Sequence, residues 1–277
     1  MKTSLQLLLG LTILVLAGCG TVPGGGQMNR AVSGHAGLDL RSGTEGIVRP
    51  GSVEASTTGS YAVGIKERLY HDEARQRALA TYIYYPTLSN EPPGLVGGSP
   101  VFKGFEAIPD AAMPAKTFPL VIISHGSGGN NFNQAYLALA LARRGMITVA
   151  ANHPGSTTGD SIPDIGAQAW LQVEDISFLF DSVLGDDELS PKIDPNAVGV
   201  IGHSKGGYSA LAVVGARLDL DKFVRLCAQT PGDPNCAFYL RGGVDFERFD
   251  RSKVEANYRD DRFKIWLLRQ RASPTSC

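Results

Sequence analysis

The chain has 277 residues, of which 43% are hydrophobic, and a formal net charge of −1 at pH 7. These values exclude a disordered or fibrous protein and fit one globular domain with a sizeable core. The near-neutral charge gives no indication of nucleic-acid binding.

The first residues have the pattern of an export signal. Lys2 precedes an apolar run, residues 5–16, which is too short to span a bilayer stably. Residues 16–19, LAGC, resemble the lipobox of bacterial lipoproteins, in which the signal is cleaved before the cysteine and that cysteine is acylated. The resemblance implies that residues 1–18 are removed and that Cys19 carries the lipid anchor. An ordinary signal peptide with an incidental cysteine is the alternative.

A flexible tether is predicted over residues 19–59, because residues 20–46 are rich in glycine and polar side chains and show no helical or strand periodicity. Three cysteines remain beyond the proposed lipid site. In an exported protein, Cys227 and Cys236 could form a disulfide across the short segment between them, which would leave Cys277 as an unpaired thiol.

From about residue 60 the chain becomes periodic. Apolar and β-branched runs predict strands, and apolar positions at helical spacing predict helices. The predicted strands are 79–85, 118–123, 146–151 and 197–201, the predicted helices are 132–142, 170–184 and 206–218, and 92–100 is a Pro- and Gly-rich loop. Because strand and helix alternate from residue 118 to residue 218, we expect right-handed βαβ units and a mostly parallel sheet with helices on both faces.

The strand at 197–201 runs into Gly202-His203-Ser204-Lys205-Gly206, and a helix follows. A strand, a sharp turn with serine at its tip and then a helix are typical of a nucleophile elbow. Glycines two residues on either side of the serine avoid Cβ clashes in such a turn. The alternative is a Gly-rich turn that carries an ordinary surface serine.

Three stretches in order give the chain a family resemblance: PLVIISHGSGG at 119–129, VAANHPGST at 149–157 and VGVIGHSKGGYSA at 198–210. With them the chain resembles the α/β-hydrolase fold, and within it the bacterial dienelactone-hydrolase-like and platelet-activating-factor acetylhydrolase-like esterases. The resemblance implies a hydrolase domain over residues 60–277, a small ester substrate, an acyl-serine intermediate and no cofactor. Ser204 matches the nucleophile, and the backbone N–H groups of Ser127 and Lys205 match the two oxyanion donors.

Three histidines lie near these motifs, and we expect a different role for each. His203 immediately precedes the nucleophile and is expected to point away from the pocket, and His125 is expected to orient the oxyanion loop. His153 lies at the end of a strand on the active-site edge and is the one that could face the pocket and rescue weak activity. The Lys205 side chain is expected to be solvated, and no spacing of histidines and cysteines indicates a metal site.

The triad of this fold follows the chain order Ser, Asp or Glu, then His, but no histidine follows His203. The acid and the base of the triad are therefore unassigned. The candidate acids that follow Ser204 in the chain do not lie at the end of a predicted strand; they are Asp245, Asp250, Asp260 and Asp261. Residues 219–260 resemble an insertion, and 262–268 resemble the next strand. We expect the C-terminal strands to be incomplete, through a premature end or frameshift near Ile265, and the exposed sheet edge to lower solubility.

These observations favour a lipid-anchored carboxylic-ester hydrolase of the bacterial cell envelope, exported to the periplasm or the outer surface, with little or no activity in this chain. The alternative is a hydrolase-like binding lipoprotein without catalysis, or a truncated remnant. The acyl and alcohol groups of the substrate, the oligomeric state and the membrane that holds the anchor are left open, because fold alone does not fix them.

Overall fold

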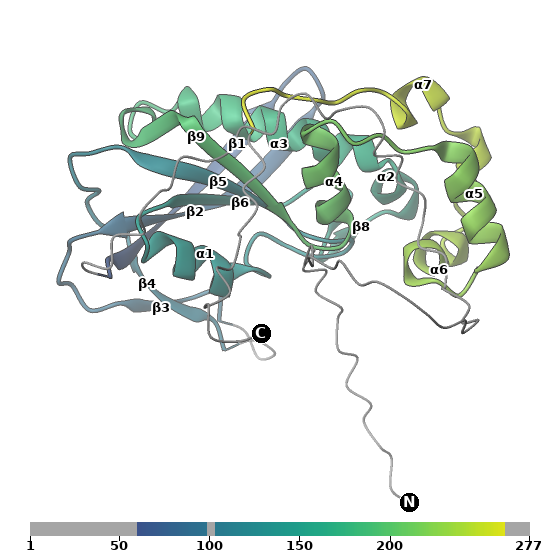
Figure 1. The fold of residues 1–277 in the computed structure, drawn as a ribbon. Helices are drawn as coiled ribbons and strands as arrows, with labels where there is room; N and C mark the ends of the chain where they lie inside the picture. The colour runs from purple at the N-terminus through teal and green to yellow at the C-terminus, as the bar shows by residue number, and fades with distance from the viewer. Residues whose placement is uncertain (1–59, 99–102, 264–277) are drawn as a thin grey trace, which may run out of the picture.

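The computed structural model describes residues 60–98 and 103–263, which form an α/β structure around a seven-stranded sheet of order β3-β4-β1-β2-β6-β5-β9 (Figure 1). The sheet strands are β1 (Ala62–Asp72), β2 (Arg77–Thr87), β3 (Gly94–Val96), β4 (Phe105–Pro109), β5 (Phe118–Ser124), β6 (Ile147–Ala151) and β9 (Ile193–Gly202). A separate small hairpin pairs β7 (Ser156–Thr157) with β8 (Asp160–Ser161). The helices are α1 (Ala135–Ala142), α2 (Pro163–Ala167), α3 (Ala169–Leu184), α4 (Lys205–Val213), α5 (Leu220–Gln229), α6 (Pro234–Arg241) and α7 (Arg251–Val254), with 3-10 turns at Ser190–Lys192 and Phe246–Arg248.

The sheet is mixed. Strands β6, β5 and β9 are parallel, as the alternation of strand and helix predicts, and β4 is parallel to β1. The hairpin β1–β2, the pair β2–β6 and the pair β3–β4 are antiparallel. The antiparallel part therefore lies on the N-terminal side, in strands that precede the βαβ units.

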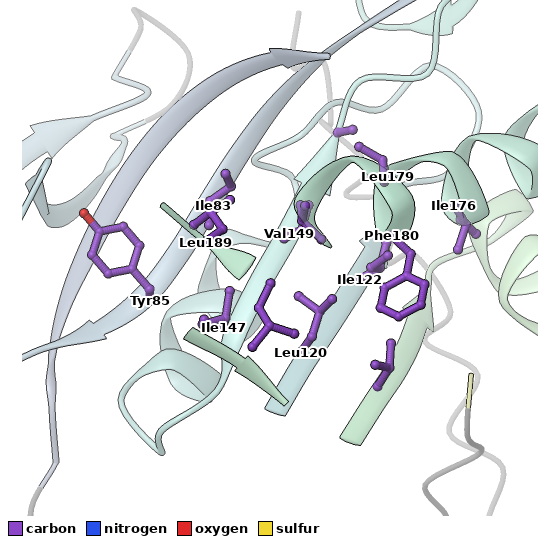
Figure 2. Packing of buried hydrophobic residues seen from close by; sticks show 14 of the residues in the cluster. Ile83, Tyr85, Leu120, Ile122, Ile147, Val149, Ile176, Leu179, Phe180 and Leu189 are labelled. Atoms are coloured by element: carbon purple, nitrogen blue, oxygen red, sulfur yellow. The ribbon is translucent and has the colours of Figure 1, made fainter. Parts of the chain in front are cut away.

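Helices cover both faces of the sheet, so alternate residues of β5 enter two different cores. Leu120 and Ile122 pack into the larger core under α3 and α4, whereas Val121 and Ile123 face the core that α1 covers. Figure 2 shows the larger core, where side chains of β2, β5 and β6 lie beneath Ile176 and its neighbours on α3. Burial on both faces explains why residues 118–123 are a continuous apolar run.

Several element boundaries differ from those expected. Strand β3 lies inside the stretch predicted as a loop, and α4 ends at Val213 rather than near residue 218. The early end follows from Gly215, whose φ of 112° does not continue a helix. Of the strand predicted at 262–268, only Arg262 and Phe263 are described, and Phe263 packs on Phe180 of α3 with ring centroids 5.5 Å apart.

Residues 219–254 form a helical cap beside the sheet. Helices α5, α6 and α7 enclose a small apolar cluster of their own, which joins the rest of the molecule through Trp170 at the start of α3. Trp170 meets Phe249 of the cap edge to face at 5.7 Å. The segment resembled an insertion because its outer surface is polar, and the structure shows that its inner surface is packed.

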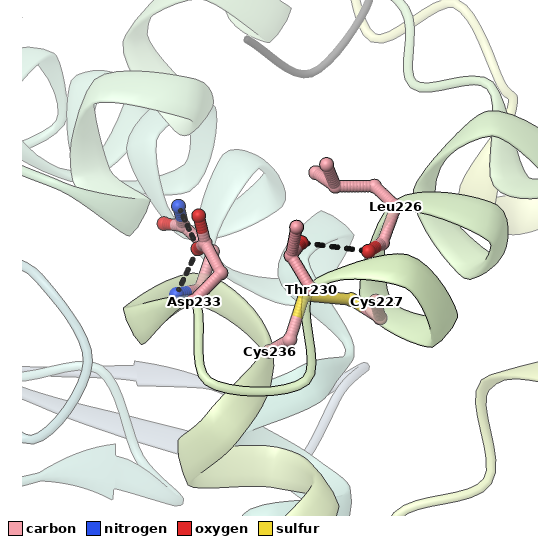
Figure 3. The surroundings of a disulfide bond; sticks show 6 residues. Leu226, Cys227, Thr230, Asp233 and Cys236 are labelled. Atoms are coloured by element: carbon pink, nitrogen blue, oxygen red, sulfur yellow. Dashed lines mark hydrogen bonds between the residues drawn. A yellow bond between two sulfur atoms is a disulfide. The ribbon is translucent and has the colours of Figure 1, made fainter. Parts of the chain in front are cut away.

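A disulfide joins α5 to α6 in the cap (Figure 3). The Cys227 and Cys236 sulfurs are bonded at 2.05 Å. Beside it Asp233 begins α6 by accepting a hydrogen bond from the Asn235 amide at 2.8 Å. The other two cysteines, Cys19 and Cys277, and the predicted signal and tether lie outside the described residues. Within residues 60–98 and 103–263, no helix has the length and apolar character needed to cross a membrane.

Candidate active site

Ser204 occupies the tip of a strained turn between β9 and α4. Its φ of 53° and ψ of −118° lie outside the regions that L-residues ordinarily adopt, and its side chain is exposed. The turn is closely packed around this residue. A Cβ at Gly202 would lie 1.9 Å from the Gly206 carbonyl oxygen, and one at Gly206 would lie 2.1 Å from the Ser124 carbonyl oxygen. Neither position can hold a side chain, so the two glycines are required by the elbow itself.

The loop at residues 124–131, which holds the predicted oxyanion donor Ser127 and is called the oxyanion loop below, lies against the elbow. A Cβ at Gly126 would be only 3.0 Å from the Cβ of Ser204, so the loop backbone approaches the serine closely. The backbone N–H groups of Ser127 and Lys205 donate to no acceptor within the described part of the chain. Two unused amide donors beside an exposed serine are the arrangement that stabilises a developing oxyanion.

His125 orients this loop from beneath. Its Nδ1–H donates to the Gly126 carbonyl at 2.7 Å, and its Nε2 accepts the backbone N–H of His153 at 3.3 Å. Gln172 of α3 donates to the His125 carbonyl at 2.6 Å. Burial and the neighbouring His153 lower the pKa of His125 to about 3, so the ring is neutral at pH 7 and keeps this tautomer. His125 thus contacts the loop that it is predicted to orient.

A second polar cluster, which we call the buried relay, lies deeper in the fold. The Ser124 hydroxyl donates to Nε2 of His153 at 3.0 Å, and Nδ1–H of His153 donates to Asp175 at 2.9 Å. Arg77 donates two hydrogen bonds to the same carboxylate, at 2.8 and 2.6 Å. Burial alone would raise the pKa of Asp175, but the hydrogen bonds from His153 and Arg77 outweigh it and hold the pKa well below its usual range.

The buried relay has the connectivity of a catalytic triad but no access to solvent. Ser124 and Asp175 are 0% exposed and His153 is 1% exposed. The Ser124 oxygen also accepts a hydrogen bond from Gln172 at 2.8 Å, so its surroundings are filled by protein. The expectation that His153 could face the pocket is therefore wrong: both ring nitrogens are engaged in the interior, because α3 places Asp175 beneath the end of β6.

The Lys205 side chain is half-buried and hydrogen-bonded within the protein, contrary to the expectation that it is solvated. Its Nζ donates to the Ser156 hydroxyl at 2.5 Å and to the Gly166 carbonyl at 2.9 Å, since β7 and α2 fold over the start of α4. Burial lowers the pKa of Lys205 to about 7. The side chain thus ties the elbow to α2 rather than extending into water.

Among the described residues the Ser204 hydroxyl has no hydrogen-bond partner, so no acid or base is held against it. The acidic residues considered from the sequence have structural partners instead. Asp245 accepts from Glu247 N, Asp250 from Ser252 N, Asp260 from Arg262, and Asp261 from Arg259. Within residues 60–98 and 103–263 there is also no group of three His, Cys, Asp or Glu side chains that could hold a metal ion.

Comparison with known proteins gives a likeness in structure only. No family model matches the chain, and no curated protein matches it either. The ferulic acid esterase from Streptomyces cinnamoneus is 22% identical with a TM-score of 0.46, over 57% of this chain and 56% of that one. The acetyl xylan esterase from Paenibacillus sp. R4 is 18% identical with a TM-score of 0.35, over 54% of this chain and 49% of that one. The chain thus spans about half the length of these two proteins.

The acylaminoacyl peptidase from Pyrococcus horikoshii is similar at 16% identity and a TM-score of 0.37, over 54% of this chain and 21% of that one. The class of fold follows from the molecule itself. A strand, a strained serine turn and a helix sit at the edge of parallel strands β6-β5-β9, and helices cover both faces. This is an α/β-hydrolase fold.

Proposed function

We propose that this protein is a serine hydrolase that cleaves carboxylic esters through an acyl intermediate on Ser204. The observation that carries the proposal is the exposed Ser204 at a strained elbow, with the free amides of Ser127 and Lys205 at its side. Strain of this kind is kept only where the surrounding structure imposes it, and it gathers at reactive positions.

The reaction would begin when Oγ of Ser204 attacks the ester carbonyl carbon and loses its proton to a base. The carbonyl oxygen becomes an anion, and the Ser127 and Lys205 amides donate hydrogen bonds to it, each contributing about 3–4 kcal/mol to the transition state. The tetrahedral species then expels the alcohol and leaves an acyl group on Ser204, which water hydrolyses in a second step.

Removal of the proton from Ser204 is the step that limits the rate of this reaction. Serine is a weak nucleophile at neutral pH unless a neighbouring group takes its proton. Because no described residue bonds to the Ser204 hydroxyl, we expect slow turnover that an added base can accelerate.

Chemical rescue by imidazole tests this function. Hydrolysis of p-nitrophenyl acetate is measured for the purified full chain and for Ser204→Ala, each with and without imidazole. We expect imidazole to add a rate to the wild type beyond the rate it adds to the variant, since a free imidazole can supply a base that no described residue provides. Equal rates for the two proteins under both conditions would reject the hydrolase and favour the non-catalytic binding lipoprotein.

We further propose that the protein is exported and held at the membrane by a lipid on Cys19, with residues 19–59 as the tether and the hydrolase domain beyond it. The Cys227–Cys236 disulfide supports export, because such bonds persist in oxidising compartments. Labelled palmitate should enter the wild type in cells and not Cys19→Ser. Equal labelling of both would reject the anchor.

A further inference from the structure

The side chains of the two proposed oxyanion residues converge on one carbonyl group. Lys205 Nζ donates directly to the Gly166 carbonyl oxygen at 2.9 Å. Ser127 reaches the same oxygen through one intermediate, Tyr239 of the helical cap: its hydroxyl lies 2.7 Å from the Tyr239 hydroxyl, which lies 3.2 Å from Gly166 O. The loop and the elbow therefore share an anchor on α2.

The direction of these bonds follows from the donors available. A carbonyl oxygen only accepts, so Tyr239 must give its single proton to Gly166 and must accept the proton of Ser127. Tyr239 is 7% exposed, and burial raises the pKa of its hydroxyl, so it holds the proton at neutral pH. The bond chain is thus Ser127 to Tyr239 to Gly166, with Lys205 on the same acceptor.

The oxyanion loop needs such an anchor because of its composition. Gly126, Gly128 and Gly129 surround Ser127, and Gly128 has a φ of 68°. Hydrogen bonds to the backbone hold these glycines, among them Gly128 N–H to the Ser156 carbonyl at 2.9 Å, and Ser127 carries the only side chain of the four-residue stretch that can add to them. A displacement of about 1 Å in a group that contacts the transition state can cost a hundredfold in rate.

We propose that Tyr239 is a positioning residue for the oxyanion site: through Ser127 and the Gly166 carbonyl it sets where the Ser127 amide lies relative to the amide of Lys205. The inference rests on the proposed function and extends it, because it makes the helical cap part of the reaction site. Three features hold the tyrosine in place. Its ring packs on Phe246 at 6.1 Å, Cys236 one turn earlier is bonded to Cys227, and Gly242 lies tightly against Pro163 of α2.

A double-mutant cycle on the reactivity of Ser204 tests the inference. The rate of Ser204 labelling by a fluorophosphonate is measured for the wild type, Tyr239→Phe, Ser127→Ala and the double variant, because the phosphonyl oxygen occupies the same oxyanion position. We expect each single variant to be about tenfold slower and the double variant to be no slower than either, since all three break the same bond chain. Tyr258→Phe is the matched control, because it removes a tyrosine hydrogen bond to the Lys253 carbonyl in which no residue of the loop takes part, and it should label at the wild-type rate.

Each outcome decides between the inference and the function on which it rests. Failure of the wild type to label faster than Ser204→Ala removes the proposed function, and the positioning role with it. Labelling of the wild type that Tyr239→Phe leaves unchanged overturns the positioning role alone, as does a double variant about a hundredfold slower, which would indicate that the two residues act independently. Ser127→Thr, which keeps the hydroxyl, should stay within about threefold of the wild type; if Tyr239→Phe fails to fold, the contrast between Ser127→Thr and Ser127→Ala decides.

Discussion

A catalytic serine needs both a group that takes its proton and access to the substrate, and two serines of this molecule each have only one of these. Ser124, in the buried relay, donates to a histidine that an aspartate orients, but it is 0% exposed. Ser204, at the elbow, is exposed and strained beside two free amides, but no described residue takes its proton. The comparison teaches that a Ser-His-Asp hydrogen-bond chain does not by itself mark an active site. Access and backbone geometry are what favour Ser204 as the proposed nucleophile, and the buried relay instead contacts the loop beside it.

The buried relay should dominate stability, and Asp175→Ala tests this with the largest expected effect. The variant leaves the Arg77 guanidinium without the carboxylate that holds it and His153 without its acceptor. Removing one partner of a buried ion pair costs about 3–5 kcal/mol of unfolding free energy. Asp181→Ala is the control, because it breaks only an exposed pair with Arg262 and should cost less than about 1 kcal/mol. Urea denaturation measures both, and equal losses would refute the distinction.

Acid should destabilise the fold through the neutral histidines. The pKa of His125 is about 3 in the folded chain against 6.5 unfolded, and burial lowers the pKa of His153 as well. Between pH 3 and pH 6.5 the unfolded chain binds more protons than the folded chain, so the free energy of unfolding falls as pH falls from 6.5 towards 3. At about 1.4 kcal/mol per pKa unit, His125 alone contributes several kcal/mol. Below about 3.8 the low pKa of Asp175 adds a further loss in the same direction.

Urea titrations at a series of pH values measure this slope. His125→Gln cannot titrate and should flatten it between pH 6.5 and 4. The same slope in wild type and His125→Gln would contradict the assignment.

Alanine substitutions at two adjacent glycines test the close packing of the elbow. Gly206→Ala places a methyl 2.1 Å from the Ser124 carbonyl oxygen and should cost about 3 kcal/mol, because backbone has to shift. Gly207→Ala meets no closer atom than the Gly202 carbonyl oxygen at 3.4 Å and lies in α4, where alanine is favoured over glycine by about 1 kcal/mol. Thermal melts should therefore move in opposite directions. A lower melting temperature for both variants would mean that the packing argument is wrong.

Relief of strain at Ser204 has the smallest expected effect. Glycine adopts a positive φ freely, so Ser204→Gly should stabilise the fold by about 1 kcal/mol while it abolishes labelling. Ser209→Gly, inside α4 at a normal helical position, is the contrast and should destabilise by a similar amount. Denaturation midpoints decide the sign, and a loss of stability in Ser204→Gly would show that the turn is not strained.

The sequence predicts the central strands and the elbow, because residues covered on both faces must be continuously apolar. It does not predict β1, in which Lys66, Glu67 and Arg68 interrupt the apolar pattern. Those charges find partners only in three dimensions: Lys66 and Arg68 both pair with Glu188, which is distant in the chain. Pairing of this kind has no local signal.

The buried relay is also missed, although a signal exists. The apolar residues of α3 predict the helix, yet Gln172 and Asp175 occupy the same face as Ile176 and Leu179 and are buried with them. Polar side chains at apolar spacing on a helix indicate a buried network. Lys205 carries no such signal, since its hydrogen bonds depend on residues of β7 and α2 that are distant in the chain.

The position of Ser204 at the N-terminus of α4 has a consequence for redesign. The positive end of a helix lowers the pKa of a thiol enough to make it a thiolate near neutral pH, but it cannot do the same for an alcohol. Cysteine has the shape of serine and would fit the turn, whereas the branched side chain of threonine would crowd a residue at positive φ. A cysteine at the elbow would be activated by the N-terminus of α4, which makes this fold a scaffold for a thiol nucleophile that needs no histidine.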